Sequence, residues 1–107
     1  MKRIGQIIGI KNEKLEYYKY LHQNIWPEIS AAIHECNIKN YSVFLKDNLL
    51  FAFYEYVGID YDADMKKLTL NPEVQRWWKE TDPCQQPLEN RQAGEWWANM
   101  EEVFHQD

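Results

Sequence analysis

One tyrosine and one histidine stand at a spacing that suits proton transfer. Tyr18 and His22 are four residues apart in the segment YYKYLHQNIWPEI. On a helix this separation is about 40° of rotation, so both side chains would project from one face. A histidine can accept or donate protons near neutral pH. The pair is a candidate site, and the same spacing also fits two residues packed at a helix end, with His22 bonded to a backbone carbonyl.

Aromatic side chains with polar tips are unusually frequent around this pair. The 107 residues include five Trp and seven Tyr, which want hydrogen-bond partners or water as well as packing. Trp77 and Trp78 would point about 100° apart on a helix, so one of them is expected to face a cavity or an interface. Together with Tyr41 on a predicted strand, these residues suit a sugar, whose C–H groups stack on aromatic planes. For Trp96-Trp97 we expect a dimer contact.

Other kinds of site are excluded by residue inventory. The three histidines, His22, His34 and His105, form no HExxH motif and have no ligand at metal-binding spacing. The four glycines form no phosphate-binding loop, and neither serine lies in a nucleophile elbow. The net charge of -5, with 12 basic residues among 17 acidic ones, argues against nucleic acid. We therefore expect no metal, no cofactor and no nucleic-acid partner.

Length and patterning indicate one cytoplasmic domain. The chain is long enough for a single core over residues 1–107 and too short for two. No apolar run approaches the roughly 20 residues that cross a bilayer, and the N-terminus lacks the features of a signal peptide. Cys36 and Cys84 fit no CxxC motif or disulfide framework, so reduced thiols are expected.

Strand and helix patterns alternate in the order β, αα, β, β, αα, β. Strands are predicted at 3–10, on both sides of a turn at Asp47-Asn48 within 41–57, and at Glu102–His105. Helices are predicted after a cap at Asn12, from Pro27 onward, over 60–70, and from an Asn71-Pro72 start through Trp78, with 82–94 as a loop. A helix break is expected between Asn24 and Trp26. This order predicts a ferredoxin-like α+β fold, a four-stranded antiparallel sheet with helices on one face.

Both faces of the predicted hairpin are apolar. One face carries Tyr41, Val43, Leu45, Leu50, Ala52 and Tyr54, and the other carries Phe44, Leu49, Phe51 and Phe53. The helices of so short a chain can cover only one of these faces. We therefore expect a homodimer, in which a second copy covers the other.

Several motifs taken together resemble the L-rhamnose mutarotase family. They are Tyr18-x3-His22, Ile25-Trp26-Pro27-Glu28, Asn40-Tyr41, Arg76-Trp77-Trp78 and Met100–His105, in the same order nearly end to end. The resemblance implies a cofactor-free enzyme that interconverts α and β anomers of a 6-deoxy sugar on a dimeric α+β barrel. It implies that His22 is the proton donor, and that Tyr18, Tyr41, Trp77 and Trp78 bind the sugar. Acid/base ring opening needs no other chemistry, and the second proton-transfer group is a tyrosine, a carboxylate or water.

One segment departs from the family pattern. Lys79–Gly94, with Trp96-Trp97 after it, differs from the corresponding part of the rhamnose enzymes, and related proteins act on L-fucose. The sugar is therefore L-rhamnose or a related 6-deoxy sugar, with L-fucose as the alternative. Two other interpretations are a ligand-binding dimeric α+β barrel without catalysis and a cofactor-independent monooxygenase of the same fold.

Overall fold

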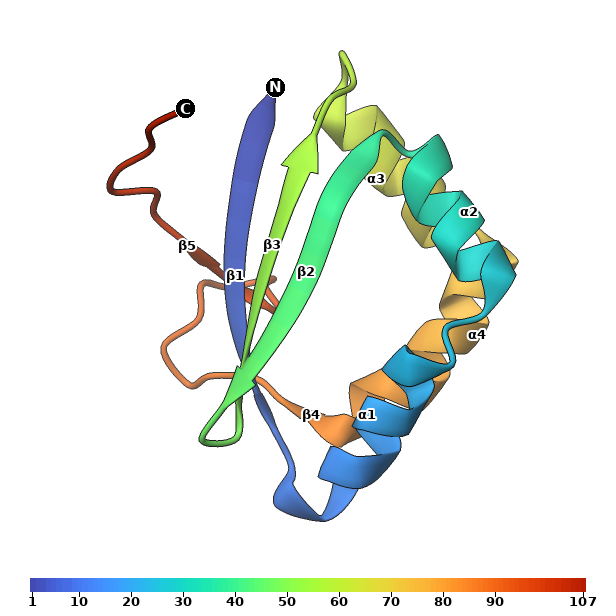
Figure 1. The fold of residues 1–107 in the computed structure, drawn as a ribbon, viewed down its shortest axis with the longest axis vertical. Coiled ribbons are helices and arrows are strands. Elements are labelled where there is room, and N and C mark those ends of the chain that lie inside the picture. Colours follow the sequence, from blue (N-terminus) through green and yellow to red (C-terminus); the bar gives the residue numbers. More distant parts are fainter.

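A curled antiparallel sheet faces four helices in the computed structural model, which describes residues 1–107 (Figure 1). The strands are β1 (Lys2–Ile10), β2 (Ile38–Lys46), β3 (Leu49–Tyr56), β4 (Gln85–Gln86) and β5 (Ala98–Met100). The helices are α1 (Leu15–Gln23), α2 (Pro27–Glu35), α3 (Tyr61–Leu70) and α4 (Pro72–Thr81), with 3-10 turns at Asn12–Lys14 and Asp82–Cys84. All four helices lie on one side of the sheet (Figure 1). None of the helices combines the length and the apolar character that a membrane span requires.

The sheet has the order β2-β3-β1-β4, with β5 also paired to β1, and every pairing is antiparallel. The predicted α+β fold is confirmed, except that two short strands share the last position of the sheet. In β4, Gln86 lies opposite Gly9. A Cβ at Gly9 would lie 2.6 Å from the Gln86 carbonyl oxygen, so only glycine fits this close backbone approach.

Two sequence predictions fail near the C-terminus. The last strand is Ala98–Met100 rather than Glu102–His105, and the predicted loop 82–94 contains a 3-10 turn and β4. After Met100 the chain leaves β1, Glu102 pairs with Arg3 at 2.9 Å, and Val103 is exposed. Within one chain, the alternating apolar residues of 102–105 have no surface to pack against, so this segment does not form a strand.

Local chemistry decides where the helices begin. Asp60 accepts a hydrogen bond from the Ala63 N–H, and Asn71 accepts from the N–H groups of Glu73 and Val74, as their cap positions predict. The predicted cap at Asn12 is wrong. There the Lys14 N–H bonds the Lys11 carbonyl in a 3-10 turn, so a backbone group takes the role of the side chain.

The predicted break between the first two helices is confirmed. α1 ends at Gln23, and α2 begins at Pro27, which has no N–H to lose at the first helical position. Asn24 closes α1 because its side chain donates to the Tyr20 carbonyl at 2.9 Å. The two short helices can therefore meet the sheet at different angles.

The β2–β3 hairpin turns at Asp47 and Asn48, both at positive φ, as predicted. A bulge interrupts the pairing between Lys39 and Ser42, where Asn40 also has a positive φ of 53°. The extra residue shifts the register by one, so that Tyr41 and Ile38 both face the helices. Without it, Ile38 would point outward.

The core lies between the sheet and the helices. One cluster joins Ile8, Ile10, Tyr18, Leu50 and Cys84, and a second joins Leu21, Ile29, Ala32, Val74 and Trp77. A third contains Cys36, Ile38 and Tyr54. Both cysteines are free and buried, and burial raises the pKa of each thiol. Helix α1 contributes to two clusters, which fixes its position between the sheet and α4.

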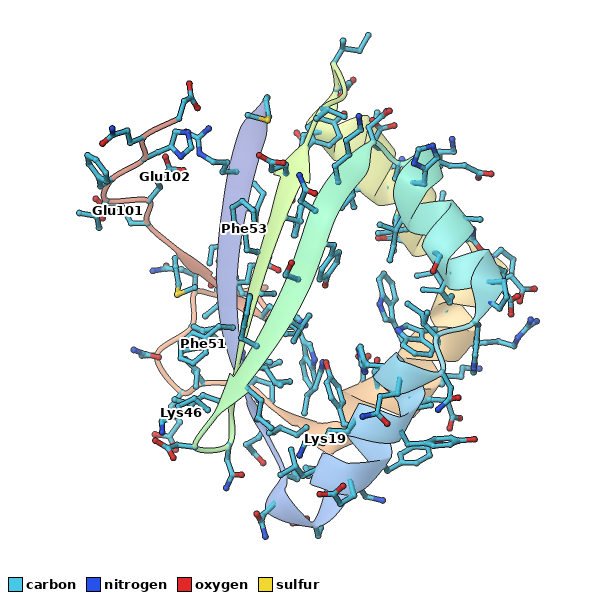
Figure 2. The ribbon with its side chains drawn as sticks, in the orientation of Figure 1. Lys19, Lys46, Phe51, Phe53, Glu101 and Glu102 are labelled. Atoms are coloured by element: carbon cyan, nitrogen blue, oxygen red, sulfur yellow. The ribbon has the colours of Figure 1, made fainter.

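The opposite face of the sheet is apolar and open. Phe51 and Phe53 point away from the helices (Figure 2), and both are only half-buried. Phe44, which lies opposite Phe51, is 65% exposed. The register thus confirms the predicted division of the hairpin into two apolar faces, one of which the single chain leaves uncovered.

Candidate active site

His22 lies on α1 with one ring nitrogen bonded and the other free. Its Nδ1 lies 2.9 Å from the backbone oxygen of Tyr18. Because a carbonyl oxygen only accepts, Nδ1 must carry the proton, and the neutral ring then has its lone pair on Nε2. Nε2 makes no hydrogen bond within the chain. Every fully buried side-chain nitrogen in the structure has a hydrogen-bond partner, so Nε2 must be accessible to solvent. The backbone bond thus orients the imidazole as a proton acceptor.

Burial sets the charge of this histidine. The half-buried position lowers the pKa of His22 below its ordinary value of 6.5, and the bond to the Tyr18 carbonyl opposes this shift only in part. The neutral ring therefore predominates at pH 7. A neutral imidazole with an open Nε2 suits a general base.

Three aromatic rings surround the imidazole. The Tyr18 ring stacks on it, with centroids 4.3 Å apart and an angle of 28° between planes. Trp77 of α4 meets it edge-on at 5.3 Å, and Trp26 meets Trp77 edge-on at 5.1 Å. Trp26 lies at the start of α2, directly after the break between α1 and α2. This position allows its ring to pack against Trp77, which in turn contacts His22.

Tyr18 is buried, and its hydroxyl has a single partner. Gln85 donates to that hydroxyl from Nε2 at 3.2 Å. Burial raises the pKa of Tyr18 well above 10, and this gain exceeds the opposing effect of the Gln85 hydrogen bond. The phenol therefore stays neutral at any physiological pH.

Tyr41 approaches from the sheet. Its ring stacks on Tyr54 with centroids 5.3 Å apart, and the Tyr54 and Tyr61 hydroxyls lie 2.6 Å apart. Tyr41 is 42% exposed, yet burial raises the pKa of its hydroxyl, so the polar end faces inward. Besides burial, the Tyr41 phenol also raises the pKa of Tyr18.

The two adjacent tryptophans of α4 have different surroundings. Trp77 is 6% exposed, belongs to the cluster of Leu21 and Val74, and touches His22 with its ring edge. Trp78 is half-buried against the same cluster and makes no ring contact with His22 or Tyr18. Of the predicted site residues, the structure brings Tyr18, His22 and Trp77 together, places Tyr41 opposite, and leaves Trp78 further out.

Two residues near Tyr18 were not predicted from sequence. Gln85 lies in a segment whose composition indicates a loop, and Trp96 donates to it from Nε1 at 2.6 Å. Trp97 is half-buried and packs against the core cluster that includes Ile8, and the dimer contact expected for Trp96-Trp97 stays a prediction. No spacing rule connects these positions with Tyr18, so the sequence carried no signal for them.

The site contains no cluster of metal-binding side chains. No three His, Cys, Asp or Glu side chains lie close enough to hold a metal ion. Two surface pockets lie elsewhere, one between α3 and α4 and one beside Tyr56 and Tyr61, and neither includes His22. The aromatic cluster around His22 is thus the place where a proton acceptor, a neutral donor and stacking surfaces meet.

Comparison with known proteins gives consistent matches over the whole chain. The family model described as L-rhamnose mutarotase matches residues 3–106. An L-rhamnose mutarotase from Bacillus subtilis is 32% identical, with both chains covered completely. A UPF0734 protein from Dictyostelium discoideum is 33% identical over 99% of this chain and 90% of its own.

Solved structures share the fold. The crystal structure of an L-rhamnose mutarotase from Formosa agariphila superposes with a TM-score of 0.78 at 23% identity, covering 100% of both chains. Tetracenomycin F2 cyclase from Streptomyces glaucescens, a type-II polyketide cyclase, gives 0.75 at 10% identity, covering 100% of this chain and 98% of its own. At these identities the two likenesses show the fold alone.

Proposed function

The chain belongs to the L-rhamnose mutarotase family, and from this we propose that it interconverts the α and β anomers of L-rhamnose by acid/base ring opening and closure. It is a sugar mutarotase, an isomerase acting on carbohydrates. The observation that carries the catalytic part of the proposal is the half-buried, neutral His22 with its accessible Nε2, set among aromatic rings.

Mutarotation needs one proton removed and one proton delivered. The anomeric hydroxyl must lose its proton, and the ring oxygen must gain one as the ring opens. The orientation and lowered pKa of His22 support a base that accepts the first proton at Nε2. The imidazolium so formed is then the donor that the family resemblance implies. No metal or cofactor is needed for either step.

The aromatic residues supply surfaces for the sugar. We propose that Tyr18, Tyr41, Trp77 and Trp78 bind it, as the resemblance implies. The inward hydroxyls of Tyr18 and Tyr41 suit sugar hydroxyls, and the Trp77 edge beside His22 suits an apolar sugar face. We place the activity in the cytoplasm, where the free Cys36 and Cys84 would stay reduced.

The function is tested by following anomer exchange directly. Saturation-transfer NMR on L-rhamnose with the purified protein is expected to show exchange between the two anomeric signals far above the rate in buffer. L-fucose in a parallel tube tests the alternative substrate. Sugar binding without faster exchange would contradict the proposed mutarotase activity. It would instead support the alternative of a ligand-binding protein without catalysis.

We also propose that the protein is a homodimer. The open face of the sheet, with Phe44, Phe51 and Phe53, is an apolar surface that a second copy would cover. Light scattering at micromolar concentration is expected to give twice the mass of one chain. Phe44→Lys should shift the protein toward monomer, since it puts a charge on that face.

The control for this prediction is Ile59→Lys. Ile59 is fully exposed and lies in the turn between β3 and α3, outside the strands that form the open face. This variant adds the same charge and is expected to remain dimeric. A wild-type protein that scatters as a monomer would remove the basis of the proposal.

A further inference from the structure

A chain of hydrogen bonds leads from the protein surface to Tyr18. The Trp96 indole donates from Nε1 to the Gln85 Oε1 at 2.6 Å, and the Gln85 Nε2 donates to the Tyr18 hydroxyl at 3.2 Å. Gln85 is 5% exposed, whereas Trp96 is partly open to solvent. A buried amide that bridges two ring systems in this way has a fixed orientation.

The direction of each bond follows from the chemistry of the groups. An indole N–H can only donate, so it must meet the oxygen of the Gln85 amide. The amide nitrogen, which also can only donate, is thereby turned to Tyr18. The Tyr18 oxygen accepts this bond, and its own proton has no acceptor within the chain. Trp96 thus fixes the orientation of the Gln85 amide, and the Gln85 amide leaves the Tyr18 hydroxyl free to act as a hydrogen-bond donor.

This donor stands beside the acceptor already described. The Tyr18 and His22 rings stack at 4.3 Å, and Nε2 of His22 has a free lone pair. One neutral donor and one acceptor side by side match the two oxygens carried by an anomeric carbon, the ring oxygen and the hydroxyl. Burial keeps the Tyr18 phenol protonated, so its donor role does not depend on pH.

We propose that Gln85 and Trp96 are positioning residues that hold the Tyr18 hydroxyl as the hydrogen-bond donor to the sugar ring oxygen. The inference rests on the proposed mutarotase function. His22 Nε2 takes the proton of the anomeric hydroxyl, and the electron pair of that O–H bond becomes the second bond of the C1 carbonyl. The bond between C1 and the ring oxygen breaks, with its pair going to the ring oxygen. Tyr18 stabilises that oxygen until the His22 imidazolium protonates it, and reclosure on the other carbonyl face reverses these steps.

The two positioning residues belong to the part of the chain that departs from the family pattern. Gln85 lies in β4, opposite Ile10, and Trp96 directly precedes Trp97 and β5. Within this part of the chain, Gln85 and Trp96 therefore reach the active site through Tyr18. This gives the departing segment a role in catalysis.

Gln85→Glu tests the proposal with almost no change in shape. A carboxylate can only accept, so it draws the Tyr18 proton to itself and away from the sugar. We expect kcat for anomer exchange to fall on the order of 10²-fold, as when one donor to a developing oxyanion is lost. Below the pKa of the introduced buried carboxyl, its O–H can donate to Tyr18 again. The ratio of variant to wild-type rate should therefore rise as pH falls.

Two tryptophan variants complete the test. Trp96→Phe keeps a ring but removes the N–H that orients Gln85, and it should lower kcat less than Gln85→Glu does. Trp97→Phe is the matched control, because Trp97 has no side-chain hydrogen bond and only packs in the core. It should keep the wild-type rate per folded molecule.

The outcomes separate this inference from the proposed function. No exchange in the wild-type protein would contradict the mutarotase function itself. Wild-type exchange with an unaffected Gln85→Glu variant would overturn the positioning role alone. The positioning role would also be overturned if Trp96→Phe and Trp97→Phe lost activity equally and in proportion to their melting temperatures.

Discussion

Replacing His22 with alanine is expected to slow anomer exchange by roughly 10²–10⁴ fold, the usual contribution of a positioned acid or base. The fold should survive, because the main loss is one hydrogen bond to the Tyr18 carbonyl, worth about 1 kcal/mol. Sugar binding should persist on the remaining aromatic surfaces. Exchange by saturation-transfer NMR and the melting temperature, measured on one preparation, give both quantities.

His34→Ala is the matched control. His34 is an exposed histidine in the last turn of α2, and its loss should change neither exchange nor melting. If His22 only packed at its helix end, His22→Ala would lower stability while the folded fraction kept its activity. Near-wild-type exchange with unchanged folding would end the assignment of His22 as the proton-transfer residue.

The pH profile gives His22 an independent signature. The pKa of His22 is lowered from 6.5, and the neutral ring is the base, so the wild-type rate should be level near pH 7. It should fall about tenfold per pH unit once the pH drops below that pKa. The bend should be absent in His22→Ala. A rate that instead rose on acidification would mean that the protonated ring is the reactive form.

Replacing Trp77 with alanine is expected to have the largest effect on stability. The side chain is buried among Leu21, Ile29 and Val74, and truncating a buried tryptophan costs about 3–5 kcal/mol. For a domain of this size the melting temperature should drop by roughly 15–30 °C. Urea denaturation followed by circular dichroism measures the free energy of unfolding.

The comparison with Trp78→Ala separates packing from sugar binding. Trp78 is half-buried, so its truncation should cost less than that of Trp77. At a temperature where both variants are folded, Trp77→Ala should also bind sugar more weakly, since a lost stacking surface costs about 1 kcal/mol. Equal effects on stability from both variants, with sugar affinity unchanged, would make the pair core residues only.

Local signals in the sequence predicted most of the elements. The turn at Asp47-Asn48, the cap at Asn71 and the break before Pro27 each depend on the chemistry of adjacent residues, and each is confirmed. The prediction for the last strand is wrong because pairing along β1 depends on where the chain returns after a long excursion. No local pattern distinguishes Ala98–Met100 from Glu102–His105 in that respect.

The residues of the candidate site also divide into those that local spacing predicts and those that only the tertiary fold brings together. Helical spacing was enough to join Tyr18 and His22, since the two lie on one helix face. Gln85 is 67 positions from Tyr18 in the chain, and its contact exists only because β4 pairs with the end of β1. The bulge at Asn40, which turns Ile38 toward the helices, likewise depends on the register of the whole hairpin.

Because β4 and β5 both pair with β1, the segment that connects them can be replaced without changing the rest of the sheet. Gln86 lies opposite Gly9 and Ala98 opposite Ile7, so residues 87–97 leave and rejoin one strand two positions apart. Doubling the length of such an excursion costs only about 0.6 kcal/mol in closure entropy. Natural variation can therefore rebuild this stretch, Trp96 included, while α1 and α4 keep His22 and Trp77 unchanged. A graft of 87–97 from a relative should therefore leave the rest of the fold in place.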